Sequence, residues 1–508
     1  MPRPEILAAI DLGSNSFHLQ IGRVVDGQIY PLDAVREVVR LGAGLTEDKR
    51  IDRATQAKAL ETLRKFAERL RGLPKQAVRA VGTNALRVAK NSPQFLREAR
   101  EALGFPIEVI AGREEARLIY LGVAHSMPPA QHKRLVVDIG GGSTEFIIGT
   151  GLEPQHTESL YMGCVSYSLR YFPDGRVDKA RLKKAELAAT QEIEGLVCEY
   201  RATGWQEAVA SSGTARSIEN ILQANGFAAD GLTREGLDKL RALLVKQEKA
   251  EPERIPGLRP NRALVLPGGL AIMCAVFDAL GLESMRVSEG ALRHGVLYDL
   301  LGRVEHRDMR EATVAQFVRR YHVDAAQAAR VASLALGIYD ALTVSRREDV
   351  PRDDDPDRIL LGWAARVAEI GLSIAHAEYH KHSAYILQNA DMPGFSRMEQ
   401  QRLARVVLAH RGKLAKVRDA GLEGSDWTLV FALRIASLIH RNRADGKLPF
   451  LRVAGEDAGF SMELPQAWLD GNALSAAALE TEAEFWRAVG MRFELSGLSD
   501  KKVSVLNR

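Results

Sequence analysis

Two segments of the chain share one pattern of apolar and polar positions. Residues 9–22, AIDLGSNSFHLQIG, align without a gap to residues 136–149, VVDIGGGSTEFIIG, which lie 127 residues later. In each copy an apolar run reaches an Asp, passes through small residues and resumes as a β-rich run. This pattern predicts a β-hairpin with Gly and Ser at its bend. Because the hairpin occurs twice, the sequence predicts two similar lobes.

Between and after the two hairpins, helical and strand patterns alternate. Helices are predicted at residues 52–73, 92–103 and 113–124, and strands at 76–82 and 107–110. A strand at 207–210, a helix after 213, a helix near 268–280 and a closing segment at 289–301 follow the second hairpin. Alternation of this kind predicts α/β layers.

The pattern changes at about residue 305 to long helices with apolar periodicity. They are predicted at residues 313–321, 325–342, 359–377 and 397–410. The last sixty or so residues contain the strand-like runs LPFLRVAG, GFSMELP and MRFEL and a helix near 474–489. We therefore predict two α/β lobes at 1–125 and 126–305, a helical domain at 306–443 and a small α+β domain at 444–508.

Composition places the chain among ordinary folded proteins. Its 508 residues are 46% hydrophobic and 26% charged, and 69 Lys and Arg against 65 Asp and Glu give a net charge of +4. So small a charge does not indicate a nucleic-acid partner. The three cysteines, Cys164, Cys198 and Cys274, are far apart and form no CxxC motif, which favours a reducing compartment, the cytoplasm.

The apolar runs do not indicate a membrane protein. The run at the N-terminus is interrupted at Asp11, so it lacks a signal-peptide core. No stretch of about eighteen uninterrupted apolar residues occurs, which predicts the absence of a transmembrane segment. Any membrane association would be peripheral.

The bend of the second hairpin has the composition of a phosphate-binding loop. Consecutive glycines let backbone N–H groups turn toward an anion, and hydroxyls beside them add donors. Asp138 and Glu145 flank the bend, and two hard oxygen ligands suit Mg²⁺ beside a phosphate. A tight hairpin with solvated carboxylates is the alternative. The candidate phosphate contacts are Gly140, Gly141, Gly142, Ser143 and Thr144.

The first hairpin repeats these features and strengthens that interpretation. It supplies a second carboxylate and a second set of small donors. Two lobes with matching loops would hold a phosphate chain from both sides. The candidate residues are Asp11, Gly13, Ser14, Asn15 and Ser16.

At this point the chain resembles a known family, the exopolyphosphatases and guanosine pentaphosphatases, within the superfamily of actin, heat-shock ATPases and sugar kinases. Both hairpins carry the resemblance, together with VRLGAGL (39–45), AVGTNALRVAKN (80–91), VIAGREEARLIYLGV (109–123), ASSGTAR (210–216), LPGGLAI (266–272) and VSEGALRHGVLYDLL (287–301). The segment IGLSIAHAEYHKHSAYILQNADMPGFSR (370–397) extends it and is similar to the longer, exopolyphosphatase type. The resemblance implies two actin-like (ribonuclease-H-like) lobes, a helical domain like His-Asp phosphohydrolases and a small α+β cap.

The family hydrolyses terminal phosphates, which requires a base that activates water. In the helix that starts near 113, Leu118, Ile119 and Gly122 follow Glu115 by three, four and seven residues, so Glu115 belongs to the inward stripe. A desolvated carboxylate holds a proton more readily, which suits a general base. A glutamate favoured by the helix dipole is the alternative reading from position alone. The resemblance assigns the catalytic glutamate to Glu115.

Two arginines and one further turn complete the candidate site. Arg87 and Arg262 match family arginines that contact substrate phosphates, and a guanidinium suits bidentate capture of phosphate. Ser212, Gly213 and Thr214 form a turn before a helix, where an anion is favoured. A simple helix N-cap explains these three residues nearly as well.

The helical domain contains a histidine cluster whose role the sequence leaves open. Histidines at i and i+4 could bind a metal, but Ala368-Glu369 stands where the resemblance expects a His-Asp pair. We therefore favour polar packing and substrate guidance over a second active site. The histidines are His376, His380, His382 and His410, and Lys381, Arg411 and Lys413 are basic residues that could guide a polyanion.

The resemblance leaves several functions to compare. The leading hypothesis is an exopolyphosphatase that processively removes terminal phosphate from inorganic polyphosphate with Mg²⁺. The alternative is a guanosine pentaphosphate (pppGpp) 5′-phosphohydrolase, or both activities in one protein. A kinase-like phosphotransferase is disfavoured by the EEARL glutamate, and a non-catalytic sensor by the set of acidic residues. A homodimer is expected from the resemblance only.

Overall fold

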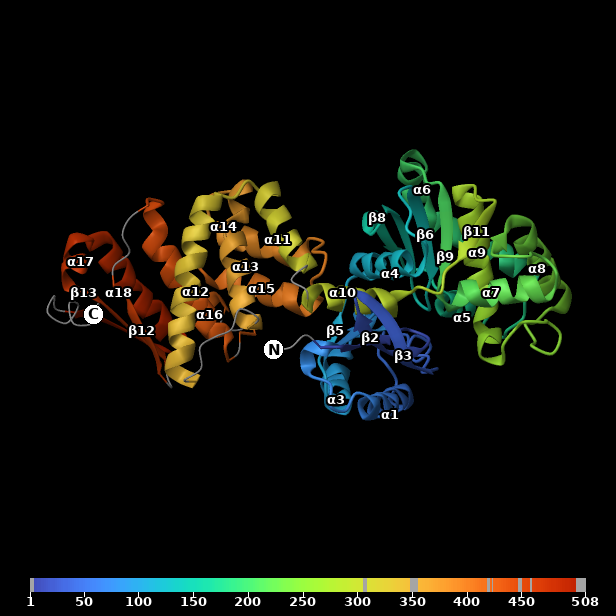
Figure 1. Cartoon of the computed structure of the whole chain (residues 1–508), viewed down its shortest axis with the longest axis horizontal. Helices are drawn as coiled ribbons and strands as arrows, with labels where there is room; N and C mark the ends of the chain where they lie inside the picture. Colours follow the sequence, from blue (N-terminus) through green and yellow to red (C-terminus); the bar gives the residue numbers. More distant parts are fainter. Residues whose placement is uncertain are drawn as a thin grey trace. The chain divides into compact units, whose positions relative to one another are not determined.

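The computed structural model describes residues 4–304, 308–347, 355–417, 421–422, 424–445, 450–456 and 459–498. It consists of two compact units, which we describe separately (Figure 1). The first unit comprises Met1–Met309 together with the short segment Pro393–Arg397. The second comprises Arg310–Met392 and Met398–Arg508.

The first lobe of the first unit is built on a five-stranded sheet with the order β3-β2-β1-β4-β5. Its strands are β1 (Ile6–Leu12), β2 (Phe17–Val25), β3 (Gln28–Glu37), β4 (Val78–Gly82) and β5 (Ile107–Val109). Its helices are α1 (Arg53–Arg69), α2 (Asn84–Val88), α3 (Ser92–Leu103) and α4 (Gly112–Ser126). The side chain of Asp52 caps α1 by accepting a hydrogen bond from the Thr55 amide, so this helix begins where its sequence supplies a cap.

The second lobe repeats this hairpin-led plan on a six-stranded sheet with the order β10-β11-β9-β6-β7-β8. The strands are β6 (Lys133–Ile139), β7 (Thr144–Thr150), β8 (Glu153–Leu160), β9 (Glu207–Ser211), β10 (Leu232–Thr233) and β11 (Ser284–Val287). The helices are α5 (Cys164–Tyr171), α6 (Lys179–Thr203), α7 (Ser212–Ala224), α8 (Arg234–Gln247), α9 (Leu266–Leu280) and α10 (Leu292–Val304). The repeated sequence pattern therefore corresponds to a repeated hairpin in the structure. Asp11 pairs with His18 in the first hairpin, and Asp138 pairs with Glu145 at the same place in the second.

Helix α9 is the most apolar segment of the chain and lies in the core of the second lobe. By length and composition alone, Pro260–Leu280 could cross a membrane, but 78% of its most apolar window is buried inside the protein. Its neighbours in that core include Ala189 and Ile193 of α6 and Ile218 of α7. The burial of α9 against these helices accounts for its apolar composition.

The second unit begins with helices, and one of them is shorter than the sequence predicts. They are α11 (Met309–Arg320), α12 (Ala325–Arg347), α13 (Pro356–Val367), α14 (Tyr379–Asn389), α15 (Arg397–Ala409) and α16 (Asp426–Ile439). The helix predicted at 359–377 ends at Val367 and is followed by a 3₁₀ turn at Ile370–Ser373. The Ser383 hydroxyl accepts from the Gly371 amide (2.9 Å) and donates to the Ala368 carbonyl (2.7 Å). A side chain from α14 therefore satisfies backbone groups that a longer helix would have paired internally.

The chain ends in a three-stranded sheet with the order β12-β13-β14. Its strands are β12 (Arg452–Glu456), β13 (Gly459–Pro465) and β14 (Arg492–Leu498), with α17 (Gln466–Gly471) and α18 (Ala473–Arg487) between the last two. Trp486 of α18, Phe431 of α16 and Phe460 of β13 pack together in its core. Mixed α/β lobes followed by a helical domain confirm the expected fold class. The division into four domains at the stated boundaries stays a prediction.

Candidate functional site

The two hairpin bends meet in the first unit and line a cavity of about 120 Å³. A Cβ added at Gly141 would lie 3.0 Å from the Ser14 Cβ and 3.2 Å from the Asn15 amide nitrogen, so the bends approach backbone to backbone. Most of the predicted site residues line the cavity. They are Asp11, Gly13, Ser14, Asn15, Ser16, Glu115, Asp138, Gly140, Gly141, Gly142, Ser143, Ser212, Gly213, Thr214 and Arg262.

Four acidic side chains are buried at or beside this cavity. Asp11, Glu115 and Asp138 line it, while Glu145 lies opposite Asp138 in the hairpin register and accepts from the Ser159 hydroxyl (2.9 Å). Burial, reinforced by the Glu115 carboxylate, raises the pKa of Asp11 to about 8. Burial likewise raises the pKa of Asp138 to about 6 and that of Glu145 well above its usual range. Burial and the other carboxylates therefore favour the protonated forms of these side chains, which a bound cation would reverse.

The donor set fits a hydrated divalent ion. The Asp11 Oδ1 atom is buried and has no hydrogen-bond partner, although a buried carboxylate oxygen normally has one. Among the described residues no group of three or more His, Cys, Asp or Glu side chains is placed to bind one metal directly. Mg²⁺ does not need such a group, because it keeps several waters and binds proteins through one or two carboxylates.

Glu115 lies in the first turn of α4, is buried and is held by an arginine. The Arg87 Nη1 atom donates to Glu115 Oε2 (2.6 Å) and to the Ile110 carbonyl (3.1 Å). Arg87 is itself buried and does not line the cavity. The structure thus places Arg87 behind the candidate base, where it orients Glu115. Direct contact between Arg87 and substrate, which the resemblance implies, stays a prediction.

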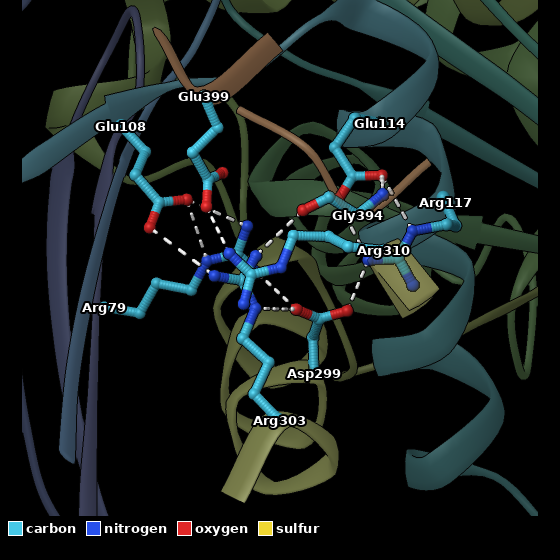
Figure 2. A network of polar contacts seen from close by, with 9 residues as sticks. All are labelled: Arg79, Glu108, Glu114, Arg117, Asp299, Arg303, Arg310, Gly394 and Glu399. Atoms are coloured by element: carbon cyan, nitrogen blue, oxygen red, sulfur yellow. Dashed lines mark hydrogen bonds and ion pairs between the residues drawn. The ribbon is translucent and has the colours of Figure 1, made fainter. Parts of the chain in front are cut away.

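A buried network of ion pairs fixes α4 beside the site (Figure 2). Arg117 pairs with Glu114 (2.7 Å) and with Asp299 of α10, and Asp299 also pairs with Arg79 of β4 (2.6 Å). Burial would raise the pKa of Asp299, but the adjacent Arg117, Arg79 and Arg303 hold it well below its usual range. The network joins three elements and keeps the first turn of α4, with Glu115, in place.

Three hydroxyl groups predicted to bind phosphate form hydrogen bonds within the protein. Thr144 is fully buried, donates to the Met162 carbonyl (2.6 Å) and does not line the cavity. Ser212, the first residue of α7, accepts from the amides of Thr214 (3.1 Å) and Ala215 (3.2 Å), a cap-like arrangement next to the N-cap residue Ser211. Thr214 donates its hydroxyl to the Ile139 carbonyl (2.9 Å). Binding of phosphate by these residues stays a prediction.

The Arg262 guanidinium packs directly against Gly213. A Cβ at Gly213 would lie only 1.8 Å from Arg262 Nη2, so the arginine occupies the space that a side chain would fill. Arg262 is buried, and burial lowers the pKa of its guanidinium. A buried cation that lines a cavity is well suited to an anionic ligand, which would restore the interactions that burial removed.

Sequence reasoning missed part of the cavity lining. Arg216 and Arg293 line it beside Arg262, and burial lowers the pKa of Arg293. His18 and Cys164 also line it, and burial with the arginines nearby lowers the pKa of His18 to about 3. Both kinds of residue could have been found in the sequence motifs. Arg216 ends the ASSGTAR segment, and His18 occupies the place of Glu145 in the repeated hairpin. The cavity thus combines three carboxylates with three arginines.

Comparison with known proteins identifies the family. Residues 20–304 match the Ppx/GppA phosphatase family, and residues 309–483 match domain III of Ppx/GppA phosphatases. The chain is 38% identical over 494 residues to a guanosine-5'-triphosphate,3'-diphosphate pyrophosphatase from Pseudoalteromonas translucida (strain TAC 125), covering 97% of this chain and 98% of the relative.

Solved structures also resemble this chain over part of its length. An exopolyphosphatase from Cytophaga hutchinsonii ATCC 33406 is 25% identical with a TM-score of 0.53, covering 59% of this chain and 98% of its own. A Ppx/GppA family member from Aquifex aeolicus is 26% identical with a TM-score of 0.50, covering 59% of this chain and 98% of its own. These neighbours confirm the expected family and its actin-like lobes. The chain belongs to the Ppx/GppA phosphatase family and is a phosphohydrolase.

Proposed function

We propose that this chain hydrolyses the terminal 5′-phosphate of guanosine-5′-triphosphate,3′-diphosphate. The observation that carries the proposal is the 38% identity, over 97% of this chain, to a relative named for that nucleotide. The likeness covers the second unit as well as the lobes. The guanosine pentaphosphate reading therefore replaces the exopolyphosphatase reading as the leading hypothesis.

In this proposal the residues of the cavity divide the chemistry between them. The backbone of the two bends and the guanidinium of Arg262 bind the terminal phosphates, because oriented N–H groups and cations spread the charge of the oxyanion. Glu115, oriented by Arg87, accepts a proton from a water. The water oxygen bonds to the terminal phosphorus, the bridging P–O bond breaks, and the leaving diphosphate oxygen keeps the electron pair. Orthophosphate and a guanosine tetraphosphate are the products.

We propose Mg²⁺ as the cofactor, held by Asp138 and Asp11 with Glu145 behind Asp138. It would neutralise the negative charge of the substrate phosphates beside these carboxylates. Burial raises the pKa of all three groups, and a divalent ion beside them would favour their ionised forms.

Water rather than a protein thiol is the nucleophile in this proposal. Cys164 lines the cavity, and burial raises the pKa of its thiol. A thiolate is the nucleophilic form of cysteine, so a thiol kept protonated is poorly suited to covalent catalysis. The acidic lining suits activation of water better.

Inorganic polyphosphate is the second candidate substrate. It is favoured by the three arginines of the cavity, which would bind any chain of phosphates, and by the solved exopolyphosphatase neighbour. The test measures kcat/KM for phosphate release from guanosine pentaphosphate, long polyphosphate and ATP, each with and without Mg²⁺. The guanosine nucleotide should give the highest value, with Mg²⁺ required. A value for polyphosphate at least tenfold higher would overturn the choice of substrate.

A further inference from the structure

The second unit contains a cavity that the proposed reaction does not use. Its volume is about 580 Å³, within the range of about 300–1,000 Å³ typical of small-molecule sites. Helices α12, α13, α14, α16 and α18 contribute to its wall, together with the loop after α15. This is the region in which the sequence places the histidine cluster and Ala368-Glu369.

Four arginines line this cavity. Two of them are paired with glutamates, and the other two are not. Arg443 pairs with Glu369 (2.7 Å), and Arg434 pairs with Glu482 and donates to the Ala409 carbonyl (2.6 Å). Arg411 and Arg441 are exposed at the rim and have no carboxylate partner among the described residues. Two uncompensated guanidinium groups at one cavity provide a site for an anion.

The rest of the wall suits a flat apolar group. Tyr379 is buried, and the Arg411 guanidinium lies 5.0 Å from the centre of its ring. Leu372, Leu438 and Phe485 contribute further apolar surface to the same cavity. A phosphate chain without a base would leave this apolar surface in contact with water, whereas a nucleobase would remove it from water.

The histidines behind Tyr379 are neutral. Burial lowers the pKa of His410 to about 3, and burial together with Lys416 and Arg411 lowers that of His380 to about 4. His410 Nδ1 lies 2.6 Å from the Val407 carbonyl, so it donates to that group, and the buried Nδ1 of His380 has no partner. His410 Nε2 also lies 3.5 Å from the Tyr379 hydroxyl, so this neutral ring supports the Tyr379 wall of the cavity.

The residues that line this cavity suit the binding of a ligand and not its hydrolysis. The cavity has no cluster of acidic side chains like that beside Glu115, since Glu369 and Glu482 are both committed to arginines. No group of three or more potential metal-ligating His, Cys, Asp or Glu side chains occurs in the described part of the chain.

We propose that this cavity is a second ligand site, which binds a nucleoside polyphosphate with its base on the Tyr379 and Phe485 side and its phosphates at Arg411 and Arg441. The site is separate from the catalytic cavity in the first unit, and the inference does not depend on which substrate the enzyme hydrolyses.

The test counts bound nucleotides on the full chain. Equilibrium dialysis with the non-hydrolysable guanosine 5′-(β,γ-imido)triphosphate is performed on the wild type, Arg411→Gln and Lys413→Gln. Lys413 is a matched control, since it is an exposed cation two residues away that does not line the cavity. We expect Arg411→Gln to weaken binding at one site per chain at least tenfold, while Lys413→Gln keeps the wild-type stoichiometry. Equal binding by all three proteins overturns the proposal.

Two further measurements separate the remaining explanations. Ala478→Trp fills the cavity from a half-buried position on α18 and should remove the same site without removing a charge. Arg262→Gln, in the catalytic cavity, should leave that site intact. If inorganic tripolyphosphate displaces the nucleotide as well as the nucleotide itself does, the base contributes nothing and the assignment to a nucleoside ligand is wrong. Circular dichroism and unfolding midpoints confirm that each variant is folded.

Discussion

At the scale of single residues, the proposed reaction depends most on Glu115. Its replacement in Glu115→Gln keeps the shape of the side chain and an acceptor for Arg87 but removes the base. We expect kcat to fall by about two to four orders of magnitude with little change in KM. Initial rates of phosphate release measure both constants. Glu101→Gln, an exposed change on α3, should be neutral, and near-normal turnover in Glu115→Gln would contradict the assignment.

Asp11 gives a prediction on pH and metal. Its pKa of about 8 in the folded protein lies above the value of about 3.8 of an unperturbed Asp. Between these values the folded chain binds a proton that the unfolded chain has released, so this residue lowers stability as pH rises from about 4 to 8. Without divalent ions, Asp11→Asn should therefore raise the unfolding temperature at pH 8.5 by a few degrees and have little effect at pH 4.

Thermal unfolding in EDTA and in Mg²⁺ tests this expectation. Mg²⁺ should stabilise the wild type at pH 8.5 and have a smaller effect on Asp11→Asn, because it supplies the charge that the carboxylate lacks. Asp48→Asn, at an exposed position, controls for loss of one negative charge. If Asp11→Asn is less stable than the wild type at pH 8.5 in EDTA, the carboxylate is compensated by the protein itself.

The residues of the site could be predicted from the sequence only where they belong to a local pattern. The glycines and small residues of the two bends stand next to an Asp after an apolar strand, and the cavity contains them. Arg87 and Thr144 lie in the same motifs, yet one pairs with Glu115 and the other with the Met162 carbonyl. Such partners come from distant segments, so the spacing of residues along the chain cannot reveal them.

At the scale of elements, the anchoring of α4 depends on Asp299 of α10. Asp299→Ala would remove the partner that buried Arg79 and Arg117 share, while Glu108 and Glu114 stay paired with them, so we expect a cost of about 1–3 kcal/mol. We expect a marked fall in the free energy of unfolding, measured with urea. Asp278→Ala breaks an exposed pair with Arg234 (2.6 Å) and should cost at most about 1 kcal/mol. Similar losses in both variants would show that the network adds nothing beyond a surface ion pair.

Elements with their own boundary signals are predicted well, and those that end on a tertiary contact are not. Helix α1 begins at its Asp52 cap, and α3 ends at Gly104, which has a positive φ of 78°. The helix predicted at 359–377 has an uninterrupted apolar pattern but ends at Val367, where Ser383 takes up the backbone groups that follow. The one nearby signal in the sequence, Gly371, lies four residues beyond the point where the helix ends.

At the scale of the whole molecule, the repeated hairpin pattern explains why the fold and the chemistry could be predicted together. The same hairpin produces a sheet in each lobe and brings two bends to one cavity, so one repeated pattern predicts both. The cavity of the second unit follows no repeat. Its wall combines residues as far apart as Val323 and Phe485, and only the folded structure brings them together.

The first unit should retain the chemistry without the second. Every described residue that lines the catalytic cavity falls within Met1–Met309. Residues 1–309 produced alone should therefore still release phosphate from a nucleotide, with a kcat within about tenfold of the full chain. The same fragment carrying Glu115→Gln is the blank, and the full chain is measured beside both.

The fragment should nevertheless be less stable than the first unit within the full chain, because it lacks the segment Pro393–Arg397. In the full chain the Gly394 amide donates to Glu114 (2.9 Å), and the Gly394 carbonyl accepts from Arg303 (2.9 Å). Leaving buried polar groups unpaired costs about 1–3 kcal/mol each, so the unfolding midpoint in urea should move to lower concentration. A fragment that unfolds cooperatively, with native circular dichroism, yet hydrolyses no nucleotide would show that the second unit takes part in the reaction itself.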